Sequence, residues 1–166
     1  MPEPTHPDLD AVARDLAAER TEVRAGLIEA LDGVSELWLG RMLRGPLARE
    51  GWTVQHEAAH HVADDAALVA LLAHAARGVE AWTAAEVRRL RGEAMHTVQR
   101  HRLTPLRAHL AESGERAAEA LRTHAAHLHR PFTMGDLAAQ PVTALLRAQA
   151  ERARAGVQAV RLTFGR

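Results

Sequence analysis

Apolar residues along this chain recur at intervals of three and four positions, and they never alternate with a period of two for long. The first stripe carries Leu9, Val12, Leu16, Val23, Leu27, Leu31 and Val34. This spacing places the apolar side chains on one face of an amphipathic helix. The helix, or a second piece of it, is expected to continue through Trp38 and Leu43 and to stop around Gly45-Pro46.

The next two helical stretches have recognisable first turns. Thr53 is placed to cap a helix whose apolar stripe ends near Gly78. Thr83 is followed three residues later by Glu86, which is the capping-box pattern. Helices are therefore expected to begin after each threonine.

Proline marks the start of the last two stretches. Thr104-Pro105 restarts a helix, since proline fits the first helical turn. The last stripe runs from Leu137 to Val160, and Pro141 lies in its first turn or at a kink. Four of these stretches are counted as principal helices, and with short connections and no strand pattern they predict one all-α domain over residues 1–166, an antiparallel four-helix bundle.

Composition narrows the classes of function. The 166 residues are 47% hydrophobic, enough for the core of one domain. Basic and acidic residues balance at 21 each, which argues against nucleic acid or an acidic membrane surface as partner. The absence of cysteine excludes disulfides, thiolate metal sites and a cysteine nucleophile. No signal peptide or membrane span is predicted, so a cytoplasmic protein is expected.

One motif stands out for its chemistry. His56-Glu57-Ala58-Ala59-His60 has the H-E-x-x-H spacing, which on a helix lets two histidines share a zinc ion while the glutamate acts on metal-bound water. This pattern would make the protein a zinc peptidase. Such enzymes support the motif with a sheet, and no strand pattern precedes it here.

Further histidines offer alternative ligands. His61 lies on the apolar stripe, so it is expected to point inward, close to His60. His124 and His127 share a helix face and would join His56 or His60 at a metal if the helix ends meet. Otherwise they complement the dipole at a helix C-terminus.

The stretch from Trp52 to His60, with the histidine eight positions after the tryptophan, resembles the start of the second helix in the DinB-like superfamily. This superfamily includes the mycothiol-dependent maleylpyruvate isomerases. The stretches 129–137 and 145–160 are similar to its last loop and helix. The resemblance implies a helical bundle, a divalent Zn or Ni ion with His60 as first ligand, and a small-molecule or thiol substrate.

The sequence departs from that pattern on the last helix. The superfamily carries two further metal ligands there, four residues apart, and the aligned positions hold Arg152 and Gly156. Glycine has no side chain, and arginine only donates hydrogen bonds. Arg152 is expected to fill the cavity with its own cation and to pair with Glu57, Asp64 or Glu151.

Three functions follow. The first is a DinB-like metal-dependent transferase or hydrolase, linked to a thiol, whose metal site is incomplete. The second is a non-enzymatic binding or interaction bundle that has lost the metal, and the third is the zinc peptidase. A homodimer with twofold symmetry is also expected, because bundles of this kind pair through helix faces.

Overall fold

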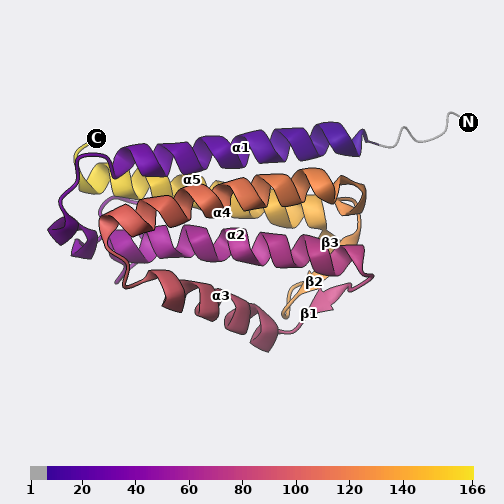
Figure 1. Cartoon of the computed structure of the whole chain (residues 1–166). Coiled ribbons are helices and arrows are strands. Elements are labelled where there is room, and N and C mark those ends of the chain that lie inside the picture. Colours follow the sequence, from indigo (N-terminus) through magenta and orange to yellow (C-terminus); the bar gives the residue numbers. More distant parts are fainter. Residues whose placement is uncertain (1–6) are drawn as a thin grey trace, which may run out of the picture.

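A computed structural model describes residues 7–166 and contains, in that part of the chain, five α-helices and a small sheet (Figure 1). The longer elements are α1 (Leu9–Ala30), α2 (Val54–Ala76), α3 (Ala84–Val98), α4 (Leu103–Thr123) and α5 (Val142–Thr163). The strands are β1 (Ala81–Trp82), β2 (Pro131–Met134) and β3 (Gln140–Pro141), and the 3-10 helices are η1 (Glu36–Gly40) and η2 (Ala125–His127). Across these residues, no helix is long and apolar enough to cross a membrane.

The helices form a bundle whose connectivity differs from the predicted one. Helix α4 packs against both α1 and α2, α5 contacts the same two helices, and α3 lies outside the bundle against α2 (Figure 1). Because α3 leads the chain back along α2, α4 starts at the same end as α2, and these neighbours run parallel. The protein is therefore mostly helical, but the strictly antiparallel four-helix bundle is not confirmed.

Three short strands, absent from the prediction, pair at one end of the bundle in the order β1-β2-β3. Strand β2 is parallel to β1 and antiparallel to β3. Trp82 and Phe132 are both buried, with ring centroids 5.5 Å apart in an edge-to-face contact. Strands of two to four residues are too short to display an alternating pattern, which is why the sequence did not reveal them.

The helix ends confirm the predicted caps. The Thr53 side chain accepts a hydrogen bond from the His56 amide, and Thr83 and Glu86 form the expected capping box. Pro141 directly precedes α5, which starts later than predicted and leaves Leu137 60% exposed.

The first helix is shorter than predicted. Helix α1 ends at Ala30, and Gly33 turns the chain with a φ of 68°, a conformation that glycine adopts without strain. Trp38 lies in η1, and Met42 forms an isolated β-bridge with Thr53. The apolar residues after Gly33 continue the helical spacing in sequence but belong to a separate segment that packs at the end of the bundle.

The core has two apolar halves. One lies at the end that holds the sheet and includes Leu68, Leu121 and Leu146; the other lies at the opposite end and includes Leu27, Val54 and Leu106. Each fully buried leucine contributes roughly 1.5–3 kcal/mol to folding.

Polar and charged side chains lie between the two halves, and we call this set the charged layer: Arg20, Arg24, His61, Asp64, Asp65 and Gln149, all buried. The carboxylate of Asp65 accepts hydrogen bonds from Arg20 at 2.8 Å, from Arg24, and from the Ser113 hydroxyl at 2.7 Å. Gln149 accepts from Arg20 and donates to the backbone carbonyl of Asp64 at 3.1 Å. The charged layer thus links α1, α2, α4 and α5.

Candidate functional site

In the first turn of α2, the His56 side chain forms a capping hydrogen bond with the backbone of Thr53. Its Nδ1 accepts a hydrogen bond from the Thr53 amide at 3.1 Å, in return for the bond that the Thr53 hydroxyl accepts. Such reciprocal bonds satisfy amide groups that would otherwise lack partners at a helix start. A metal at His56 would therefore have to use its other ring nitrogen.

His60 lies one turn further along α2 and is buried. Its ring meets the Trp52 ring edge-to-face, with centroids 5.1 Å apart, and the Arg49 guanidinium stacks on that indole at 4.4 Å from its centroid. Its Nε2 lies 3.4 Å from a carboxylate oxygen of Asp64. Burial lowers the pKa of His60, while Asp64 acts in the opposite direction. The predicted first ligand is thus a neutral imidazole oriented by a carboxylate.

His61 and Glu57 form a second, deeper pair. The Nε2 atom of His61 lies 3.3 Å from Oε1 of Glu57, and both side chains are at most 2% exposed. Burial lowers the pKa of His61 from 6.5 to about 3 and raises the pKa of Glu57 above its ordinary value of 4.5. Desolvation disfavours the charged form of both groups.

The Glu57 carboxyl group occupies the place beside Gly156 on α5. A Cβ atom on Gly156 would lie 1.8 Å from Oε1 of Glu57 and 2.5 Å from its Cδ. No side chain at residue 156 could coexist with this glutamate conformation. Only glycine lets the two helices hold the carboxyl group between them.

This arrangement makes stability depend on pH in a way that Glu57→Gln isolates. Because the folded pKa of Glu57 is raised, its contribution to stability is complete below pH 4.5 and is lost as pH rises through the folded pKa. Glutamine stays neutral, so the variant should gain unfolding free energy relative to the wild type as pH rises above 4.5. Urea unfolding over a pH series measures the difference. In both proteins, the His61 contribution is present above pH 6.5 and is lost towards pH 3.

Glu86→Gln provides a control of opposite sign. Hydrogen bonds from Thr83 lower the pKa of Glu86, so this variant should lose stability relative to the wild type as pH rises. If the Glu57→Gln difference did not change with pH, Glu57 would ionise alike in the folded and unfolded chains.

The charged partner of Asp64 comes from α3 rather than from the predicted residue. Arg91 places a guanidinium nitrogen 3.4 Å from a carboxylate oxygen of Asp64. Arg152 is exposed, and among residues 7–166 it forms no ion pair with Glu57, Asp64 or Glu151. The predicted pairing of Arg152 is therefore wrong, because the guanidinium that pairs with Asp64 belongs to Arg91. Sequence reasoning overlooked Arg91, although Arg88 and Arg91 share one face of α3 at a spacing of three.

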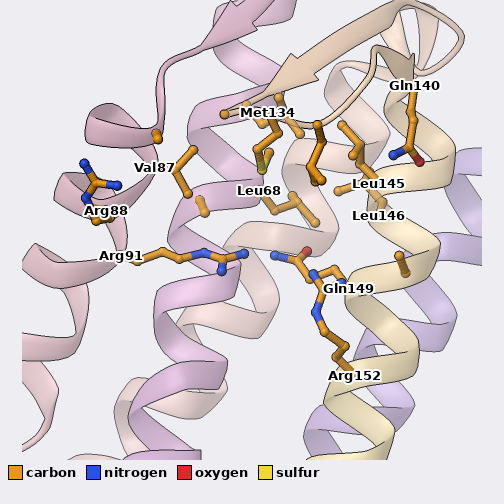
Figure 2. A pocket seen from close by; sticks show the side chains of 16 residues that line it. Leu68, Val87, Arg88, Arg91, Met134, Gln140, Leu145, Leu146, Gln149 and Arg152 are labelled. Atoms are coloured by element: carbon orange, nitrogen blue, oxygen red, sulfur yellow. The ribbon is translucent and has the colours of Figure 1, made fainter.

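Arg152 instead lies at the edge of a cavity of about 650 Å³, which Figure 2 shows from close by. Helices α2, α3 and α5, together with β2 and the segment after it, form its walls. The residues that line it include Leu68, Val87, Arg88, Arg91, Met134, Leu145, Leu146, Gln149 and Arg152. A volume of this size is typical of small-molecule sites.

The structure separates the predicted histidines. His60 and His61 are neighbours on α2, whereas His124 ends α4 at the other end of the bundle, where its ring lies 6.4 Å from that of His127 (Figure 1). In the part of the chain that the structure describes, none of His56, His60 and His61 lines the cavity. Within the described residues, no three histidine or acidic side chains are grouped so that they could hold a metal ion.

The fold is similar to that of a known enzyme. The chain superposes on the "crystal structure of the mycothiol-dependent maleylpyruvate isomerase" with a TM-score of 0.70 and 18% identity over 89% of its length. The chain superposes on a histidine-to-alanine variant of that enzyme with a TM-score of 0.71 and 17% identity. The chain spans 60% of the length of either structure. No known protein family and no curated protein matches the sequence. The predicted DinB-like fold is confirmed.

Proposed function

We propose that this chain is a DinB-like protein that binds a small molecule without the resident divalent metal that the resemblance implies. One observation carries the proposal: the carboxyl group of Glu57 fills the space beside Gly156 where the superfamily has a ligand side chain. Arg152, at the second ligand position, is a cation at the edge of a cavity. The residues present therefore do not fit the family metal.

The cavity supports a binding role. It is large enough for a ligand, it is bounded by five elements of the fold, and it lies beside Asp64 and Arg91, next to the position of the expected metal site. His60 is turned to Asp64 and lies outside the cavity lining. A ligand in the cavity would thus contact arginine, glutamine and apolar side chains.

A metal-dependent transferase or hydrolase is the second candidate. The observation in its favour is that three buried atoms, Oε1 of Glu57, Nε2 of His61 and Oδ1 of Asp64, have no hydrogen-bond partner among residues 7–166. Groups of this kind often mark a ligand site. The zinc peptidase has less support, since Glu57 is 1% exposed and faces Gly156 rather than open space. A thiol partner and a homodimer stay predictions.

Metal analysis tests the proposal. Untagged protein, incubated with Zn²⁺ or Ni²⁺ and then desalted, should retain far less than one ion per chain, because catalytic zinc needs three protein ligands. Combining Glu57→Ala, Arg152→Glu and Gly156→His should restore stoichiometric binding, whereas Arg152→Glu alone should not. Mass spectrometry of the desalted protein measures both. Stoichiometric metal in the wild type that disappears in His60→Ala would establish the enzyme candidate instead.

A further inference from the structure

The two ends of the cavity differ in chemistry. Figure 2 shows Arg91 and Arg152 reaching towards Gln149 from α3 and α5, while Leu68, Met134 and Leu145 gather at the other end. Among the described residues, the lining contains no aspartate and no glutamate. An occupant that satisfies both ends must carry a negative charge on an apolar body.

The charged end has more positive charge than its neighbours neutralise. Arg91 shares Asp64 with His60, at 3.4 Å in both contacts. Arg88 and Arg152 form no ion pair within residues 7–166. Partial burial lowers the pKa of Arg152, and although Asp64 opposes this, the guanidiniums of Arg91 and Arg49 lower it further. An anion placed between Arg91 and Arg152 would relieve that repulsion, and guanidinium groups bind carboxylate and phosphate through two parallel hydrogen bonds.

Gln149 lines the charged end of the cavity, where Arg91 and Arg152 reach towards it (Figure 2). Its side chain accepts from Arg20 and donates to the carbonyl of Asp64, so the charged layer holds it in place. Gln149 and Arg152 are three residues apart on α5 and share a helix face. The floor of the charged end is thus an amide held by hydrogen bonds, and the guanidiniums of Arg91 and Arg152 approach it from α3 and α5 (Figure 2).

The apolar end excludes strongly polar occupants. Leu68 and Leu146 are buried at its base, and Val87, Met134 and Leu145 are half-buried around it. Burying an alkyl chain there gains about 0.8 kcal/mol for each CH₂ group, whereas a sugar or a second charge would lose hydration without gaining a partner.

Resting on the proposed function, we propose that the cavity binds an amphipathic anion, a small organic acid whose carboxylate or phosphate meets Arg91 and Arg152 while its apolar chain lies against Leu68 and Leu145. A carboxylate and a phosphate are both anions that accept hydrogen bonds from guanidinium groups. Neutral apolar compounds of equal size lack the contact with the guanidiniums and bind more weakly.

Calorimetric titration of the full chain with octanoate, octyl phosphate and octanol tests this inference. At least one of the two anions should bind about tenfold more tightly than octanol, since a hydrogen bond to a charged group is worth that factor or more. Arg152→Gln should remove most of the advantage of the anion and leave octanol binding unchanged. Arg147→Gln, an exposed arginine on the same helix that does not line the cavity, is the matched control and should bind like the wild type.

The outcomes separate the two proposals. Equal affinity for the anions and octanol, unchanged by Arg152→Gln, would overturn the anion inference and leave small-molecule binding in place. Val87→Trp, which fills the apolar end, should weaken all three probes, and its unfolding curve shows whether it is folded. If no probe binds the wild type, the anion inference fails, while the metal content decides the proposed function separately.

Discussion

Replacing Asp65 with asparagine should lower the free energy of unfolding by about 3–5 kcal/mol, the usual result of removing one partner from a buried ion pair. Asp65 is 1% exposed and is the shared acceptor for Arg20, Arg24 and Ser113. Asparagine preserves the shape but removes the negative charge, which leaves two buried guanidiniums without compensation. Urea unfolding of the variant and the wild type measures the difference.

A surface ion pair provides the control. Asp32 accepts from Arg107 at 3.2 Å, but the Asp32 side chain is 71% exposed. Water screens this pair, so Asp32→Asn should change the unfolding free energy by less than about 1 kcal/mol. If Asp65→Asn were as mild as Asp32→Asn, the buried arginines would have found other partners and the charged layer would not depend on Asp65.

The second large effect is expected at Gly156. A new methyl group in Gly156→Ala would overlap the Glu57 carboxyl group, and moving a buried side chain aside should cost about 1–3 kcal/mol. Once Glu57→Ala has cleared the space, the same substitution should stabilise the protein by roughly 0.5–1 kcal/mol, because alanine favours a helix more than glycine does. A double-mutant cycle read by urea unfolding yields the coupling between the two residues.

Gly92 on α3 is the matched control for this cycle. It is exposed, and apart from its neighbours in the helix, a Cβ atom there would meet no other atom of residues 7–166 within 4 Å. Gly92→Ala should therefore stabilise the protein by roughly 0.5–1 kcal/mol, by helix propensity alone. A Gly156→Ala variant that behaves like Gly92→Ala would show that Glu57 turns aside without cost, and the metal position would then be less firmly closed than we propose.

The sequence predicted the helices well where local signals decide. Thr53 and Thr83 act through their own backbone neighbours, so their spacing alone predicted where α2 and α3 begin, whereas α5 begins after Pro141, later than the apolar stripe from Leu137 indicated. The end of α1 at Ala30 was predicted too late because the apolar spacing continues through Val34, and only tertiary packing shows that the residues after Gly33 form the second of the two pieces that the sequence left open.

The sequence predicted several residues of the site but not the residues that contact them. The sequence singled out His60, Arg152 and Gly156. Which side chain each of them contacts depends on the distances between α2, α3 and α5. Glycine at 156 indicated a missing ligand, and only the distance between helices shows that Glu57 takes its place. Likewise, Arg91 reaches Asp64 because α3 lies outside the bundle against α2.

The charged layer has a consequence for the alignment of the helices. Arg20 and Arg24 lie one turn apart, so a shift of α1 by one turn, about 5.4 Å, would bring one of them into an apolar half of the core and leave Asp65 with a single arginine partner. Gln149 ties α5 to the same level. Sliding of either helix is therefore strongly penalised, as it is by a single buried polar residue in a coiled coil. The charged layer therefore keeps α2 and α5 aligned along the bundle axis, although the cavity lies between parts of these two helices.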